Sequence, residues 1–181
     1  MEQTLIILKP DAVQRGIVGE IISRFERAGL KIVAAKMLQP DYEHYVRHYE
    51  GIGTLKTRKG KEVFESTLAS MQDGPVIALV IEGVEAVETV RKMVGDTQPK
   101  SALPGTIRGD YAHVSYGQAS SAGRGVANII HASADQAEAA QEITHWFTSN
   151  EIHNYTATHE QFTQPKAQTS PRSSMDRITP S

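Results

Sequence analysis

The stretch Val76-Ile77-Ala78-Leu79-Val80-Ile81 consists of six consecutive apolar residues and begins directly after the turn Asp73-Gly74-Pro75. A short apolar run that is rich in β-branched residues is typical of a strand covered on both faces. The run Thr4-Leu5-Ile6-Ile7-Leu8 has the same character and ends at Lys9-Pro10. These two runs predict central strands of a sheet that helices cover.

The segments around these strands alternate between helical and extended patterns. Apolar residues recur at helical spacing from Val18 to Phe25, and Gly29 is positioned to end that helix. The other predicted elements are a strand at 30–38, a short helix at 41–49, a loop at 51–60, helices at 61–71 and 85–94, and a strand at 110–116. This order predicts an α/β (α+β) sandwich of the ferredoxin-like βαββαβ type, an antiparallel sheet covered by helices, with an extra helical pair before the third strand.

The length of 181 residues predicts one domain, at 1–160, and a further short segment. From about residue 164 the chain is rich in Pro, Ser, Thr and Gln, so we expect 164–181 to be a flexible C-terminal tail. Residues 115–127 are rich in Gly, Ala and Ser and are expected to form an inserted loop.

The composition excludes several classes of function. The 39% hydrophobic and 22% charged residues are ordinary for a globular protein, and the formal net charge of −2 gives no general reason to bind nucleic acid or an anionic membrane. The absence of cysteine excludes thiol catalysis, thiolate metal sites and disulfides. No apolar run approaches the roughly 20 residues that span a bilayer, and the N-terminus does not resemble a secretory signal. We therefore expect a cytoplasmic location and no membrane partner.

His131 is the candidate nucleophile. A neutral imidazole can carry a transferred group covalently if a neighbour fixes its tautomer and leaves the other nitrogen free. Glu138 and Glu142 could each orient the ring, and Arg108 could meet an anionic substrate with a planar charged fork. By spacing alone these residues only suggest phosphoryl transfer.

Two local alternatives remain open at this point. Ser133 could act beside the imidazole, or it could cap the last helix, because Ser133-Ala134-Asp135-Gln136 fits a capping box. Glu142 follows His131 by 11 residues, and one straight helix would separate them by about 16 Å. Pairing of the two therefore requires the chain to turn near Ser133, so that the helix packs back over the imidazole.

Three motifs in register resemble those of the nucleoside diphosphate kinase family. They are Lys9-Pro10-Asp11-Ala12-Val13-Gln14-Arg15-Gly16, Gly105-Thr106-Ile107-Arg108-Gly109-Asp110 and Asn128-Ile129-Ile130-His131-Ala132-Ser133. Together with Glu142 and Trp146-Phe147 behind them, the resemblance covers roughly residues 4–155. It implies a ping-pong enzyme that takes the γ-phosphate of a nucleoside triphosphate onto a histidine and passes it to a different nucleoside diphosphate.

The resemblance also implies the roles of single residues. By position His131 is the phosphorylated nucleophile, Glu142 and Ser133 lie beside it, and Lys9 belongs to the catalytic set. The residues implied around the phosphates and sugar are Lys9, Tyr49, Arg91, Thr97, Arg108 and Asn128. The base would stack near Val63 and Thr67, with Phe64 adjacent. Magnesium is implied as the cofactor, held mainly by the nucleotide phosphates and water rather than by protein ligands.

The sequence departs from the usual family pattern in three places. The basic loop before Val63 is longer, and Lys56, Arg58, Lys59 and Lys61 cluster around its end, either as a solvated face or as a collector of anions. The segment 115–127 is also longer and could cover the site or join a subunit contact. Ala134 stands where an aspartate is frequent. Family members are hexamers or tetramers, and 95–105 resembles the family's assembly loop, so a homo-oligomer is expected.

Two other functions compete with the active kinase. The first is a nucleotide-binding regulatory or interaction paralogue with weak or no kinase activity, against which the retained His131 and its cationic neighbours argue. The second is an accessory nucleic-acid-binding role of the basic cluster at 56–61, which would weaken steeply with salt. The near-neutral charge argues against the second as a main function.

Overall fold

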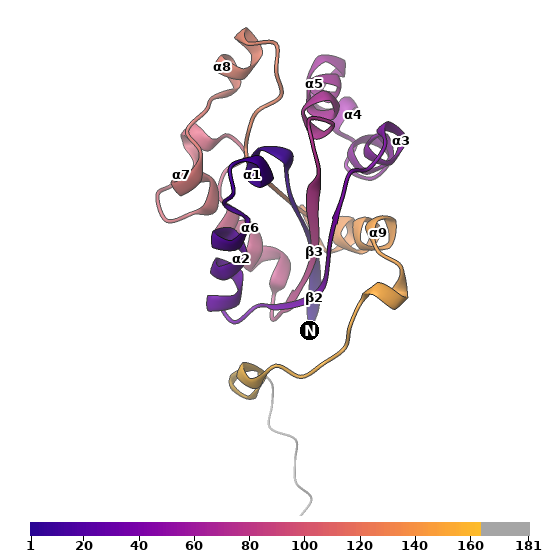
Figure 1. Ribbon diagram of the computed structural model, residues 1–181, viewed down its shortest axis with the longest axis vertical. Helices are drawn as coiled ribbons and strands as arrows, with labels where there is room; N and C mark the ends of the chain where they lie inside the picture. Colours follow the sequence, from indigo (N-terminus) through magenta and orange to yellow (C-terminus); the bar gives the residue numbers. More distant parts are fainter. Residues whose placement is uncertain (164–181) are drawn as a thin grey trace, which may run out of the picture.

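The computed structural model describes residues 1–163, and the predicted tail at 164–181 lies outside the described residues. Its centre is a sheet of four strands: β1 (Glu2–Leu8), β2 (Lys31–Leu38), β3 (Val76–Gly83) and β4 (Ile130–Ala132). The strand order is β2-β3-β1-β4, and every neighbouring pair is antiparallel. Figure 1 shows β2 and β3 side by side. The two apolar runs of the sequence are thus the two central strands, as predicted, and the ferredoxin-like fold is confirmed.

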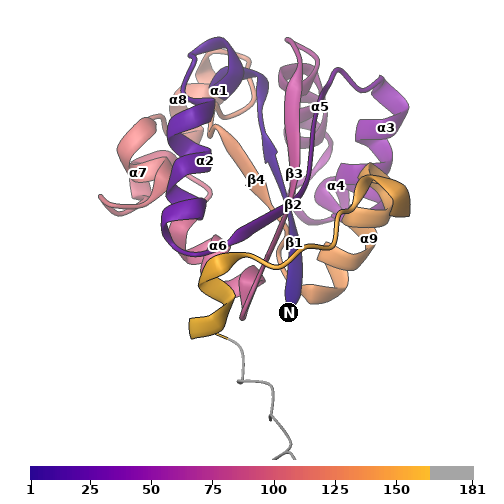
Figure 2. The ribbon, with the colours of Figure 1, turned by 60° about the horizontal axis from the view of Figure 1, so that its bottom comes forward.

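Helices cover both faces of the sheet (Figure 2). One layer contains α1 (Pro10–Gln14), α2 (Val18–Arg27), α6 (Ala86–Val94) and α7 (Ile107–Tyr111). The other contains α3 (Tyr42–Val46), the π-helical turn η1 (Arg47–Ile52), α4 (Leu55–Lys59), α5 (Lys61–Met71) and α9 (Gln136–Trp146). Successive residues of β1 point to opposite faces, so Leu5 and Ile7 pack under α9 while Ile6 and Leu8 pack under α2.

The predicted strand at 110–116 is wrong. Thr106 caps a short helix there, because its hydroxyl accepts a hydrogen bond from the Gly109 amide at 3.1 Å, and α7 follows. The fourth strand is instead β4, which pairs with β1 over three residues. So short a strand, with a histidine at its centre, has no apolar run that a sequence pattern could reveal.

The predicted loops at 51–60 and 115–127 both contain helices. The carboxylate of Glu50 accepts hydrogen bonds from the start of α4, at 2.6 Å from the amide of Lys56. The second segment contains α8 (Tyr116–Ser121), capped by the hydroxyl of Ser115. Neither helix has an apolar stripe, since α4 buries no residue and α8 buries only Ala119, and helical spacing therefore could not be recognised.

The chain beyond α9 runs along the edge strand β2 to the start of that strand. It includes the 3-10 turns η3 (Ser149–Glu151) and η4 (Thr158–Phe162), and one further 3-10 turn, η2 (Pro99–Ser101), follows α6. Lys31 anchors the returning chain: its ammonium contacts Glu160 at 2.8 Å and Glu82 at 2.7 Å and donates to the Tyr155 carbonyl. Within residues 1–163, no helix has the length and apolar character needed to cross a membrane.

Candidate active site

His131 lies at the centre of β4, opposite Ile7 of β1, with a side chain that is 17% exposed. Its Nε2 atom is 2.8 Å from Oε1 of Glu142. A buried carboxylate accepts hydrogen bonds and cannot donate them while ionised, so the proton of the neutral imidazole resides on Nε2. The contact therefore leaves the lone pair of Nδ1 free.

Glu142 is completely buried and receives a chain of hydrogen bonds from the central strand. The Leu5 amide donates to Ser133 Oγ at 3.2 Å, and that hydroxyl donates to Glu142 Oε2 at 2.6 Å. Both carboxylate oxygens are thus engaged, one by Ser133 and one by His131. Such bonds fix the orientation of the carboxylate and offset the cost of its burial.

The alternatives for Ser133 and Glu138 are decided by this geometry. The N-cap of α9 is Asp135, whose carboxylate accepts from the Glu138 amide at 2.8 Å, so Ser133 is not the cap. The carboxylate of Glu138 accepts from the Ala134 amide at the exposed start of the helix. The chain turns between β4 and α9 as required, and the helix brings Glu142 back over His131.

Lys9 directly follows β1, and its side chain reaches the segment that leads to His131. Its ammonium donates to Asn128 Oδ1 at 2.7 Å, and the Asn128 amide donates to the carbonyl of Thr97 at 3.0 Å. Burial, together with the nearby charge of Arg108, lowers the pKa of Lys9 to about 8, although the attraction of Asp11 opposes this. The structure thus joins three of the predicted residues, from three distant parts of the chain, in one hydrogen-bonded row.

Arg108 is buried, and its guanidinium donates to three backbone carbonyls. The acceptors are Asn128 at 3.1 Å, Gly95 at 3.0 Å and Ile130 at 2.6 Å. Burial lowers its pKa to about 10, so the group still carries a positive charge at neutral pH. Because a guanidinium has five N–H donors, two remain for an anion after these bonds. Arg108 therefore both fastens the loops around His131 and supplies charge there.

Arg91 and Thr97 complete the predicted set around the phosphates. Arg91 extends from α6 and donates to the Ser133 carbonyl at 3.4 Å, which places a second guanidinium beside the end of β4. Thr97 is exposed in the loop after α6. The site therefore gathers one ammonium and two guanidinium groups on the side of the sheet where β1 ends.

Tyr49 and the unpredicted His48 lie behind the imidazole on η1. The ring of Tyr49 is 6.3 Å from that of His131 and the ring of His48 is 4.6 Å from it, both at steep angles. His48 is buried, lies 3.4 Å from Glu142 Oε1, and accepts a hydrogen bond from Trp146 Nε1 at 3.1 Å. Sequence reasoning noted His48 only as part of a helix, since no local pattern reports a contact with α9.

The predicted base-stacking residues separate in the structure. Val63 is 43% exposed at the start of α5, whereas Phe64 is 4% exposed and packs with Leu68 and Met71 in the core. Burial of Phe64 argues against its predicted contact with a nucleotide. Thr67 is half-buried, and its hydroxyl is bonded to the Val63 carbonyl at 2.7 Å.

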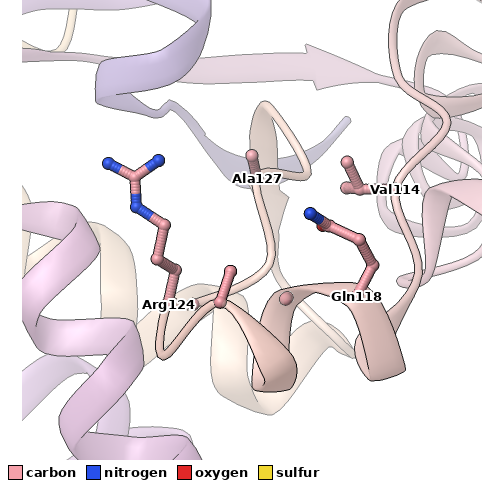
Figure 3. Close-up of a pocket in the computed structure, with 7 residues that line it drawn as sticks. Val114, Gln118, Arg124 and Ala127 are labelled. Carbon is pink, nitrogen blue, oxygen red and sulfur yellow. The ribbon is translucent and has the colours of Figure 1, made fainter.

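The segment after α8 packs against α5 and borders a small cavity. A Cβ atom on Gly125 would lie 2.5 Å from Ser70 Oγ, so only glycine allows this approach of the backbone. A cavity of about 220 Å³ lies between α8 and the segment that leads to Asn128 (Figure 3). Its lining consists of Val114, Gln118, Ala119, Ala122, Arg124, Gly125 and Ala127.

Ile129, two residues before His131, has a left-handed backbone with a φ of 61°. This conformation is costly for a β-branched residue, about 1–3 kcal/mol. Both of its peptide groups are held: its amide donates to Asp11 at 3.0 Å and its carbonyl accepts from the Lys9 amide at 2.9 Å. The left-handed conformation of Ile129 turns the chain between Asn128 and β4, so that the side chains of Asn128 and His131 both reach the site.

The donor set tests whether the protein itself would bind magnesium. The ligand atoms of His48, His131 and Glu142 lie within 4.8 Å of one another, but the Glu142 oxygens already accept hydrogen bonds. The carboxylate of Asp11 is likewise engaged by the Ile129 amide. Imidazole is also a poor ligand for Mg²⁺, which prefers oxygen. Among the described residues this cluster is therefore poorly suited to hold Mg²⁺ by itself.

Comparisons with known proteins agree with this geometry. A family profile described as nucleoside diphosphate kinase matches residues 2–152. The nucleoside diphosphate kinase of Borreliella burgdorferi is 46% identical over 155 residues, 86% of this chain and 92% of the relative. That of Pyrococcus furiosus is 46% identical over 168 residues, 93% and 96% of the two chains.

Solved structures give the same result. A transition-state mimic of the Borrelia burgdorferi enzyme with bound vanadate and ADP has a TM-score of 0.85 at 46% identity, covering 88% of this chain and 94% of that one. An NDP kinase from Pyrobaculum aerophilum has a TM-score of 0.76 at 41% identity, covering 84% and 99%. Profile, sequence identity and fold agree over the region that contains the site, and the chain belongs to the nucleoside diphosphate kinase family.

Proposed function

We propose that His131 is the residue that this kinase phosphorylates, and that it attacks through Nδ1. The observation that carries the proposal is the 2.8 Å contact between Nε2 and Glu142, which places the ring proton away from the attacking atom. The fold match to a relative with bound vanadate and ADP supports a site built for a phosphoryl group beside a nucleotide.

The transfer takes place in two half-reactions. In the first, the Nδ1 lone pair bonds to the γ-phosphorus, the bond from phosphorus to the β–γ bridging oxygen breaks, and the nucleoside diphosphate leaves with that electron pair. In the second, a terminal oxygen of another nucleoside diphosphate attacks the phosphorus and the bond to Nδ1 breaks. The Nε2 proton stays between His131 and Glu142 throughout and stabilises the charge that develops on the ring.

The cations supply the charge that phosphoryl transfer requires. Lys9, Arg91 and Arg108 would neutralise the phosphate oxygens, and Asn128, already bonded to Lys9, would orient the ammonium and the sugar. Tyr49 would donate a hydrogen bond to a phosphate oxygen, since its hydroxyl has no partner within the described residues. Thr97 would add a hydroxyl at the rim, and Val63 an exposed apolar contact for the base. Fixed donors of this kind lower the barrier because they need no reorganisation during transfer.

Magnesium would enter with the nucleotide. When bound between the phosphates it would neutralise their charge and hold them in the reactive arrangement. A homo-oligomer, hexamer or tetramer, and a cytoplasmic location complete the proposal, as the family resemblance implies for this chain.

A single-turnover experiment tests the proposal directly. The protein is incubated with ATP and magnesium, the nucleotide is removed, and the intact chain is weighed. We expect a gain of one phosphate that is labile in acid, absent in His131→Ala and discharged by added GDP.

The variant must still bind nucleotide, which a titration with ADP checks. Phosphate retained in His131→Ala would move the nucleophile elsewhere. No phosphate on the natural chain, despite nucleotide binding, would favour the regulatory paralogue instead.

A further inference from the structure

We propose that Trp146 and His48 form a positioning pair that reserves Glu142 for the nucleophile. Trp146 fixes the tautomer of His48, and His48 in that tautomer cannot donate to the oxygen that His131 uses. The inference rests on the proposed role of His131 and concerns two buried side chains.

The tautomer follows from the donor inventory. The indole Nε1 of tryptophan is only a donor, so the 3.1 Å contact requires His48 Nδ1 to be the acceptor. A neutral His48 must then carry its proton on Nε2. Burial keeps the pKa of His48 well below its usual range, and the nearby charges of His131, His145, His44 and Lys9 act in the same direction. A third state, protonated on both nitrogens, is thereby disfavoured.

The competition concerns a single oxygen atom. Glu142 Oε1 is 2.8 Å from His131 Nε2 and 3.4 Å from His48 Nδ1. If His48 carried a proton on Nδ1, a small movement would let it donate to that oxygen and weaken the bond that orients His131. The freed imidazole of His131 could then place its own proton on Nδ1, the atom that must attack.

The surroundings leave little else to hold His48. The side chain is fully buried between η1, β4 and α9, and its Nε2 atom has no hydrogen-bond partner within residues 1–163. The groups that face it are His131 on β4, Glu142, His145 and Trp146 on α9, Tyr49 beside it, and the more distant His44 and Lys9. The contact with Trp146 therefore favours the form with its proton on Nε2, against the Glu142 carboxylate, which favours the form with its proton on Nδ1.

Nitrogen NMR of the ¹⁵N-histidine-labelled natural chain is the first test. We expect His48 to show an unprotonated Nδ1 and a protonated Nε2 in the absence of nucleotide. Protonation of Nδ1 in the natural chain would overturn the proposal, whatever the variants do. This readout does not depend on catalysis, so it remains informative even if phosphorylation of His131 fails.

The variant Trp146→Phe removes the donor but keeps an aromatic ring. We expect a fraction of His48 to take its proton on Nδ1, and the rate of phosphohistidine formation to fall about tenfold, as for other losses of a supporting hydrogen bond. The KM for ATP should stay within about twofold, because Trp146 is buried in the core. A tenfold fall in rate without a change in the His48 signals would contradict the mechanism.

Two controls separate positioning from packing. Ile143→Ala removes a buried apolar side chain of the same helix and core cluster that makes none of the polar contacts of His48, so it should lower stability and leave the phosphorylation rate within about twofold. In a His48→Phe background, Trp146→Phe should have no further effect on the rate. Position 48 then has no imidazole whose tautomer Trp146 could fix. Additive losses in the double variant would show a packing effect only and reject the pair.

Discussion

At the scale of single residues, burial of the Lys9 ammonium lowers its pKa to about 8, and the phosphates of a nucleotide would reverse that shift. We expect ATP binding between pH 8 and 9 to be accompanied by proton uptake and to weaken as the pH rises further. Calorimetry in two buffers of different ionisation enthalpy measures the protons taken up. Lys9→Met should bind more weakly at pH 7 and take up no proton; uptake that persists in Lys9→Met would assign it to another group.

The same lowered pKa has an opposite effect on stability. A lysine that ionises at about 8 in the folded chain and about 10.4 in the unfolded chain binds fewer protons when folded. The contribution of Lys9 to stability therefore rises as the pH increases from 8 to about 10.

Glu142 and Glu138 give a matched pair of variants on one helix. We expect Glu142→Ala to slow phosphorylation by about tenfold to a hundredfold, because His131 loses the acceptor that fixes its proton. Glu138→Ala should leave the rate unchanged, since its carboxylate only accepts from the exposed Ala134 amide. Rapid-quench measurement of phosphohistidine formation distinguishes them, and equal rates for the two variants would refute the assignment of the orienting carboxylate.

At the scale of elements, two residues before α9 have different expected roles: Asp135 caps the helix, and Ser133 donates to Glu142. Asp135→Ala should lower the free energy of unfolding by about 1 kcal/mol through loss of the N-cap, with little change in the rate of transfer. Ser133→Ala should slow transfer, because Glu142 loses a donor on Oε2. Denaturant titration and single-turnover rates measure the two effects. A large loss of rate in Asp135→Ala would mean that the cap itself positions Glu142.

The elements also show how far the sequence allowed prediction. The central strands β1 and β3 were predictable because continuous apolar runs indicate strands that are buried on both faces. Helix α7 and strand β4 were not: the strand pattern at 110–116 competes with the Thr106 cap, and three residues are too few for a pattern. The motifs identified His131, Lys9 and Arg108, while spacing alone left Glu138 and Glu142 undecided. The role of His48 could not be predicted, because it depends on the packing of η1 against α9. The contact joins His48 to Trp146, 98 positions further along the chain.

At the scale of the whole molecule, Lys31 joins the beginning of the sheet to the end of the described chain. Burial acts to lower its pKa, but the hydrogen bonds to Glu160 and Glu82 outweigh that effect and raise it. The bond to Lys31 holds the pKa of Glu160 below its usual value, and the same is true of Glu82 although burial opposes it. The carboxylates therefore stabilise the fold above about pH 4.3, and this contribution is lost as the pH falls through their folded pKa values. Lys31 itself contributes below about pH 10.4 and loses that contribution as the pH rises through its raised pKa.

We accordingly expect Lys31→Met to lower the Tm at pH 7, and the difference from the natural chain to shrink towards pH 3. Lys36→Met is the matched control, since the contact of Lys36 with Glu151 is more exposed and should matter little. Calorimetric scans across this pH range measure both. A difference in Tm that stays constant with pH would show that the Lys31 side chain acts through packing and not through its charge.

The order in which the chain supplies its parts has a consequence for synthesis. Lys9, Tyr49, Arg91, Thr97 and Arg108 all precede residue 128, whereas the proposed nucleophile His131 and its partner Glu142 arrive with β4 and α9. A ribosome that has released only the first 120 residues thus exposes most of the proposed phosphate-binding side chains but not His131. On the proposed mechanism the last strand completes both the sheet and the site, so we expect a nascent chain to transfer no phosphate until β4 and α9 have formed.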